Sequence, residues 1–102
     1  MPIRNLNKQA TTAGTAEVLE TMAADNFCAW IHFFLQSGAT GPCRIGGPDT
    51  SITNKLGQEL QPGATLQWPG NGSPGPYHTG RIYVDFAGNA AGADLLSCII
   101  GT

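Results

Sequence analysis

The stretch "NFCAWIHFFLQ", residues 26–36, is the strongest apolar element of the chain and decides its fold class. In an extended strand, successive side chains point to opposite faces, and here both faces are largely apolar. One face would carry Phe27, Ala29, Ile31, Phe33 and Leu35, and the other Cys28, Trp30, His32 and Phe34. A strand with one face in water alternates between apolar and polar residues. The pattern therefore predicts a β-strand covered twice, by an opposing sheet and by a neighbouring subunit, with His32 as a core or interface histidine.

On both sides of this strand, short apolar runs are separated by turn residues, which is typical of an all-β domain. "CRIGG" (43–47), "RIYVDF" (81–86) and "LLSCIIG" (95–101) read as strands, and residues 46–58 read as a long loop. "TAEVLETMA" (15–23) fits a strand or a short helix, and the β surroundings favour the strand. "LQPGATLQW" (60–68) contains a Pro-Gly pair typical of a type II turn. Six or seven such strands predict a single β-sandwich or jelly-roll-like domain over residues 14–102.

Residues 1–13 are polar, with Ile3 and Leu6 as the apolar anchors, and show neither helical nor strand periodicity. Such a segment buries too little apolar surface to fold alone. We expect an extended N-terminal arm outside the sandwich. It is either a frayed terminus or an arm that becomes ordered on a partner.

The composition restricts the partners of the chain. Of its 102 residues only 12% are charged, about half the roughly 25% of an ordinary soluble domain, and the net charge is −2. No basic stripe is present, which argues against a nucleic-acid partner, and no apolar run suggests a membrane partner or a signal peptide. We expect a soluble protein made in the cytoplasm. The three cysteines lack metal-ligand spacing and are expected to be buried thiols, with a disulfide between two of them as the alternative.

The sequence contains no catalytic, cofactor-binding or metal-binding motif. His78 with Asp49, Asp85 and either Ser51 or Ser73 is a conceivable catalytic set, but nothing in the sequence marks these residues as neighbours. We therefore expect a protein that is not an enzyme and needs no cofactor.

The segment "WPGNGSPGPYH", residues 68–78, is rich in glycine and proline and has aromatic residues at both ends. As a stiff contact loop, it would present Trp68, Tyr77 and His78 to a sugar or a protein partner. However, Trp68 continues the alternation of Ala64 and Leu66, which favours a place in the core. The interpretation that we favour is a loop between strands whose surface contacts another protein.

Four motifs occur in the same order as in the small virion proteins of tailed bacteriophages: "TTAGTAEVL", "CRIGGPDTS", "LQPGATLQW" and "GRIYVDFAGNAAGADLLSCIIGT". The chain resembles this family over most of its length from Thr11 onward, and most of all the capsid decoration, or cement, proteins. The resemblance implies a β-sandwich without enzymatic activity that binds the major capsid protein on the capsid exterior, commonly as a homotrimer, after assembly in the host cytoplasm. The long aromatic loop and the aromatic strand 27–35 depart from the family pattern.

We add two hypotheses about surfaces, neither of which is carried over from a family motif. We expect an arm around Pro2, Ile3, Arg4, Asn5 and Leu6 to contact the capsid. We also expect a subunit interface on the strand 27–35, formed by Trp30, His32 and Phe34. The alternatives are a carbohydrate- or receptor-binding module of a phage tail, and a head–tail connector or tail component.

Overall fold

The computed structural model describes residues 3–20, 27–69, 76–88 and 94–101. These residues form ten β-strands and one short 3-10 helix, η1. In chain order the elements are β1 (Ile3–Gln9), β2 (Glu17–Val18), β3 (Phe27–Cys28), β4 (Trp30–Leu35), β5 (Cys43–Gly46), β6 (Gln58–Leu60), β7 (Thr65–Trp68), β8 (Tyr77–His78), η1 (Thr79–Arg81), β9 (Tyr83–Phe86) and β10 (Leu95–Gly101).

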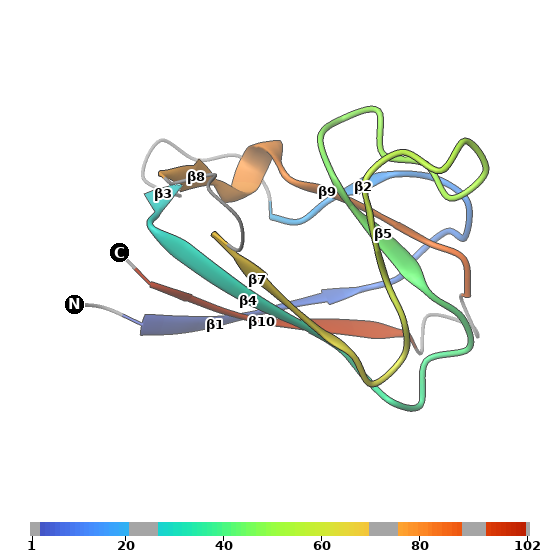
Figure 1. Cartoon of the computed structure of the whole chain (residues 1–102), viewed down its shortest axis with the longest axis horizontal. Coiled ribbons are helices and arrows are strands. Elements are labelled where there is room, and N and C mark those ends of the chain that lie inside the picture. The colour runs from blue at the N-terminus through green and yellow to red at the C-terminus, as the bar shows by residue number, and fades with distance from the viewer. Residues whose placement is uncertain (1–2, 21–26, 70–75, 89–93, 102) are drawn as a thin grey trace.

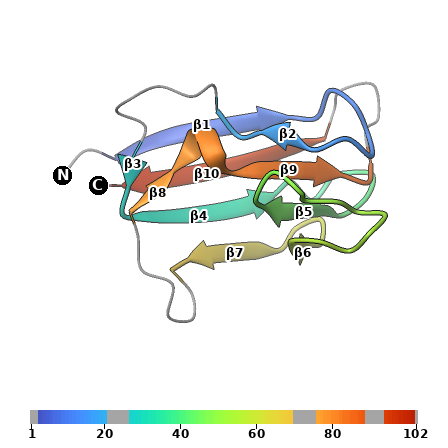
Figure 2. The same ribbon diagram turned by 90° about the horizontal axis from the view of Figure 1, so that it is seen from above.

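The strands form two antiparallel sheets that pack face to face, so the predicted all-β sandwich is confirmed (Figure 1). Sheet I has the order β1-β10-β4-β7, and sheet II has the order β2-β9-β5-β6. The short strands β3 and β8 pair with each other at one end of the sandwich (Figure 2). All the pairings between the described strands are antiparallel, and β5 and β6 are the one pair of strands that follow each other in the chain.

The core lies between the two sheets and is built by alternate residues of the longest strands. Sheet I contributes Ile31, Phe33 and Leu35 from β4 and Leu96, Cys98 and Ile100 from β10; sheet II contributes Cys43 and Ile45 from β5 and Val84 and Phe86 from β9. Ile82, directly before β9, is buried as well.

The predicted Pro-Gly turn connects the two sheets. The Ala64 N–H donates to the carbonyl of Gln61 at 2.9 Å, and Gly63 has a φ of 82°, as the third residue of a type II turn requires. The turn leads from β6 in sheet II to β7 in sheet I. Ala64, Leu66 and Trp68 then face the core, as the alternation predicted.

The N-terminal segment corrects one prediction. Ile3–Gln9 is not an arm outside the sandwich, because it forms β1 and pairs with β10 from Ile3 opposite Gly101 to Gln9 opposite Leu95. Leu6 packs against the core, and backbone hydrogen bonding to β10 compensates for the poor apolar pattern of the strand. The proposed domain boundary at residue 13 therefore does not hold for residues 3–9, and Pro2 lies outside the described residues.

The aromatic strand also differs from its prediction. The chain bends at Ala29, which separates β3 from β4 and shifts the alternation by one residue. Cys28 is consequently buried together with Ile31, whereas Phe27, predicted on the same face as Ile31, is 52% exposed. The predicted strand at 15–23 contains β2, and residues 21–23 lie outside the described part of the chain.

Candidate functional site

The side of sheet I that faces away from the core is an open surface, which we call the outer face of sheet I. The strand register aligns its side chains in rows across the sheet, for example Asn5–Ile99–His32–Gln67. The full set of strand residues on this face is Ile3, Asn5, Asn7 and Gln9 from β1, Leu95, Ser97 and Ile99 from β10, Trp30, His32 and Phe34 from β4, and Thr65 and Gln67 from β7. The three residues predicted for a subunit interface thus lie side by side on one surface.

The two outer faces of the sandwich differ in charge and in cover. The strand residues of the outer face of sheet I include no Lys, Arg, Asp or Glu. On sheet II, Arg44, Glu59 and Asp85 lie in one row of the register, and Arg44 forms an ion pair with Glu59 at 3.4 Å. The loop between β5 and β6 folds over this row, where the Ile52 N–H donates to Oδ2 of Asp85 at 2.8 Å. In Figure 1, no described loop lies below sheet I and over its outer face in this way.

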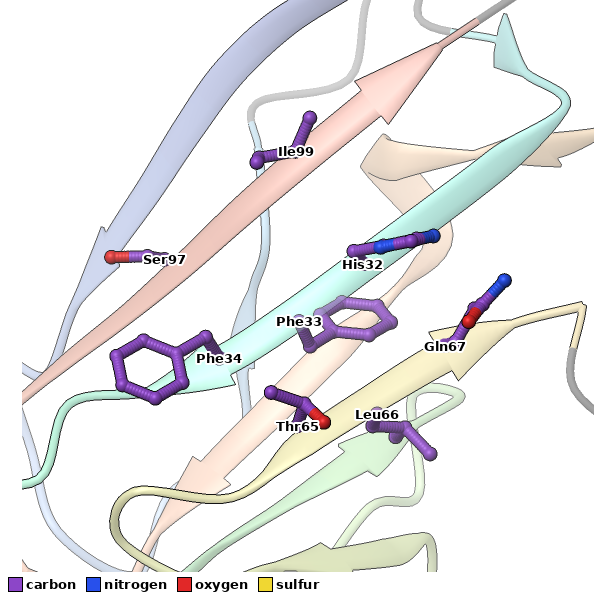
Figure 3. Close-up of a pocket in the computed structure, with 8 residues that line it drawn as sticks. All are labelled: His32, Phe33, Phe34, Thr65, Leu66, Gln67, Ser97 and Ile99. Carbon is purple, nitrogen blue, oxygen red and sulfur yellow. The ribbon is translucent and has the colours of Figure 1, made fainter.

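A shallow hollow of about 370 Å³ lies near the centre of the outer face of sheet I. It is lined by side chains and backbone of three strands: His32, Phe33, Phe34, Thr65, Leu66, Gln67, Ser97 and Ile99. The rings of His32 and Phe34 point away from each other along β4, and Thr65 and Gln67 border the hollow on the β7 side (Figure 3). Ring surfaces and neutral hydrogen-bonding groups therefore lie around one depression.

Two contacts hold side chains in place around this hollow. Nε2 of Gln36 donates to the hydroxyl oxygen of Ser97 at 2.7 Å. The indole of Trp30 occupies the space above Gly101 that any larger residue would need for its Cβ. The same indole meets the ring of His32 edge-on, with 5.2 Å between the ring centroids. His32 is exposed and is therefore a surface histidine. The predicted core position is wrong, and the interface position stays a prediction.

The four residues Ile3–Leu6 predicted to contact the capsid are ordered in β1. Asn5 lies on the outer face, and Leu6 packs against the core. The guanidinium of Arg4 makes two hydrogen bonds of 2.7 Å to the carboxylate of Glu20, next to sheet II. These hydrogen bonds are the main cause that lowers the pKa of Glu20, against the opposing effect of burial.

A second ion pair closes the same edge of the sandwich. Nζ of Lys8 lies 3.2 Å from the carboxylate of Glu17. Burial acts to raise the pKa of Glu17, but hydrogen bonds from Thr11, Thr12 and Lys8 outweigh it, and this pKa is also lowered. Both pairs join β1 of sheet I to the segment that contains β2 of sheet II, so β1 is fixed to both layers.

The three residues predicted for the contact loop do not form one exposed site. Trp68 is half-buried against the core, where its ring meets Phe33 edge-on at a centroid distance of 5.1 Å, and its Nε1 donates to Gln58 at 2.7 Å. Tyr77 packs beside Trp68, with 5.6 Å between the ring centroids. Nδ1 of His78 accepts the Gly80 N–H at 3.0 Å and so caps η1. The core position favoured for Trp68 is confirmed, whereas the loop tip, residues 70–75, lies outside the described residues.

Neither a metal centre nor a membrane span is found in the described residues. His, Cys, Asp and Glu side chains do not gather there in threes, as a metal site would need. Nor is any described helix long and apolar enough to span a bilayer. Cys28, Cys43 and Cys98 are buried and unpaired, as predicted. Burial raises the pKa of Cys43 and of Cys98 to about 12, which keeps both thiols protonated at neutral pH.

One end of the sandwich presents two large apolar side chains to solvent. Ile3, at the start of β1, is 66% exposed, and Phe27, in β3, is 52% exposed. The start of β1, the end of β10, and the strands β3 and β8 lie at the same end of the molecule (Figure 1). We call this region, defined by Ile3 and Phe27, the apolar end.

No family model, curated protein or solved structure matches the chain.

Proposed function

We propose that this chain is a non-catalytic structural protein of a tailed-phage virion, of the capsid decoration type, which binds the shell of major capsid protein and stabilises it. The proposal starts from the order of the sequence motifs and is supported by the all-β sandwich. It places the protein on the capsid exterior, in contact with capsid protein and with further copies of itself as a homotrimer.

The observation that carries the proposal is the apolar end. Ile3 and Phe27 are two of the four large hydrophobic side chains that are clearly exposed among the described residues, and they share one end of the molecule. A patch of exposed apolar side chains is typical of a protein interaction site. Burying each of them against a partner would contribute about 1.5–3 kcal/mol. In this proposal, β1 makes the capsid contact that was predicted for an extended arm outside the sandwich.

Co-sedimentation with shells assembled from the major capsid protein of the same phage tests this function. The double variant Ile3→Lys/Phe27→Lys should bind the shells at least about tenfold more weakly, because both apolar contacts are replaced by charges. Leu56→Lys is the matched control, since Leu56 is 42% exposed in the loop between β5 and β6 and should bind like the wild type. Circular dichroism would show that all three proteins are folded.

Two results would contradict the proposal. The first is a wild-type protein that fails to sediment with both unexpanded and expanded shells. The second is equal binding by the double variant and the wild type. Light scattering behind a sizing column then decides the assembly: a mass of three chains fits a decoration protein, whereas a ring of six or more chains favours the connector or tail alternative.

A further inference from the structure

The outer face of sheet I shares Ile3 with the apolar end, but the rest of this face has a different chemistry. Apart from its apolar residues, it carries neutral hydrogen-bonding side chains, of which a large share are amides. The amides are Asn5, Asn7, Gln9, Gln36 and Gln67, and the hydroxyls are Ser97 and Thr65. Each amide both donates and accepts hydrogen bonds, and so does each hydroxyl. A surface of this kind attracts neither anions nor cations, but it offers many neutral donors and acceptors.

The hollow places these groups around ring surfaces. Phe34 and His32 stand at its two ends along β4, and Gln67 and Thr65 line the side toward β7 (Figure 3). Ser97 accepts from Gln36, so its own O–H hydrogen remains available to donate to a ligand. At about 370 Å³ the hollow is near the lower end of the roughly 300–1,000 Å³ range of small-molecule sites. Its size suits one six-membered ring with its substituents.

We propose that the outer face of sheet I binds a neutral glycan, with one sugar ring in the hollow between His32 and Phe34. A pyranose has an apolar C–H side that packs against aromatic rings and a rim of uncharged hydroxyls that pair with amides and hydroxyls. The lack of charged side chains on the strands of this face matches a ligand without carboxylate, sulfate or amino groups. Further sugar residues would extend across the rows toward Asn5 and Asn7 on β1.

The size and polarity of the face favour a glycan over a second copy of the chain. With strands about 4.8 Å apart and about 20 Å long, four strands project to roughly 400 Å². A stable protein complex buries about 800 Å² of accessible surface on each partner, so a second copy would have to cover this whole face. A second copy would also bury its amides against the amides of the first, and each of them would need a partner in fixed geometry. A glycan leaves its outer hydroxyls in water and avoids that cost.

The inference goes beyond the proposed capsid function. It rests on the hollow between β4, β7 and β10, whose lining includes neither Ile3 nor Phe27, so the two proposals can fail separately. Native electrophoresis in gels that contain dextran, mannan or hydroxyethylcellulose provides the test. We expect the wild-type protein to be retarded in at least one of these neutral gels. Carboxymethylcellulose, which has the same backbone as hydroxyethylcellulose but carries negative charges, should not retard it.

Two pairs of variants identify the surface. Phe34→Ala and Gln67→Ala should each weaken the retardation about tenfold, by removal of the ring surface and of an amide. Leu56→Ala and Gln61→Ala are the matched controls, because both residues are exposed, flank β6 of sheet II and do not line the hollow. The controls should be retarded like the wild type. Binding of Phe34→Ala and Gln67→Ala to capsid shells should remain at the wild-type level.

Three results would overturn the inference. One is a wild-type protein that none of the three neutral gels retards. Another is equal retardation of Phe34→Ala, Gln67→Ala and the wild type. The third is a multimer that Phe34→Ala converts into monomers in light scattering, since the outer face would then be the predicted subunit interface of Trp30, His32 and Phe34.

Discussion

The indole of Trp68 combines packing and hydrogen bonding at a single residue. Its ring contacts Phe33 and Tyr77 on the core side of β7, and its Nε1 hydrogen bond to Gln58 ties β7 to β6 in the other sheet. The residue lies next to a loop rich in glycine and proline. This position suggested from the sequence that Trp68 could bind a ligand. The alternation with Ala64 and Leu66 was the better guide, because a strand fixes the face of each side chain.

Replacing Trp68 with alanine should therefore destabilise the protein. We expect the free energy of unfolding to fall by about 3 kcal/mol, from the lost packing and the cavity that remains. Trp68→Phe, which keeps a ring but not the Nε1 donor, should lose only about 1 kcal/mol. Urea unfolding of both variants measures these losses. A folded Trp68→Ala protein of wild-type stability would contradict the core position.

The buried thiols of Cys43 and Cys98 should make the fold sensitive to alkali. Their pKa values of about 12 lie above the ordinary value of 9.0 that the unfolded chain would have. Each protonated thiol thus contributes stability that is fully present below pH 9 and is lost as the pH rises toward 12. Between these limits, each thiol should lower the free energy of unfolding by about 1.4 kcal/mol per pH unit.

Urea unfolding at pH 8, 9, 10 and 11 checks this expectation. Because lysine and tyrosine side chains also titrate there, the comparison is with Cys98→Ala, whose decline with pH should be shallower by the share of one thiol. A variant with the same pH dependence as the wild type would contradict it. In the native protein at pH 8, a thiol reagent should modify the cysteines only after denaturation.

Among the elements, β1 is the strand that the sequence pattern did not predict. Its residues IRNLNKQ contain two apolar side chains, so no hydrophobic alternation marks a strand. The strand forms because β10 offers a complete ladder of backbone partners and because Arg4 and Lys8 find Glu20 and Glu17 on the opposite layer. The two glutamates lie 16 and 9 residues away in sequence, and the β10 partners are residues 95–101. Pattern analysis along a single segment cannot detect an edge strand that is stabilised in this way.

The pairing of β1 with the second layer should weaken in acid. The lowered pKa of Glu20 means that its contribution to stability is present above about pH 4.5 and is lost as the pH falls through the pKa of the folded protein. At pH 7, Glu20→Gln should cost about 1 kcal/mol, a small value because the pair is partly exposed. As the pH falls through the lowered pKa of Glu20 in the folded protein, the advantage of the wild type over the variant should disappear, since protonated Glu20 no longer pairs with Arg4.

The matched control is Glu59→Gln, which removes a single and longer contact to Arg44 on sheet II. It should change the stability by less than about 0.5 kcal/mol at pH 7. Urea unfolding between pH 7 and pH 3 compares the three proteins. A Glu20→Gln variant as stable as the wild type at pH 7 would show that the ion pair does not secure β1.

For the other elements, the sequence was a better guide. The strands β5, β9 and β10 and the Pro-Gly turn lie where short apolar runs and turn residues predicted them. In the aromatic segment, the pattern identified the strand but missed the bend at Ala29. Because both faces of the segment are apolar, a shift of the alternation by one residue leaves no sign in the sequence. Phe27 was consequently placed inside the protein, although it is part of the apolar end.

At the scale of the whole molecule, the sandwich keeps its charges away from one side. Sheet II is covered by its own loop and carries one ion pair, and Arg4 and Lys8 at the β1 edge form two more. The strand side chains on the outer face of sheet I, by contrast, include no Lys, Arg, Asp or Glu. Low overall charge was evident from composition, but its distribution was not. The hollow joins residues of β4, β7 and β10, which lie up to 67 residues apart in the chain, so only the strand order 10-4-7 reveals it.

The register of β1 and β10 places Ile3 directly opposite Gly101. Paired residues in an antiparallel ladder have Cα atoms only about 5 Å apart, so the polypeptide nearly closes on itself. A short linker between these two positions, with a break in the exposed loop at Asn54 and Lys55, would give a circularly permuted chain that retains every strand pairing. The linear order of the strands is therefore one of several that encode the same sandwich. Partners fused to either end of the protein would also emerge side by side.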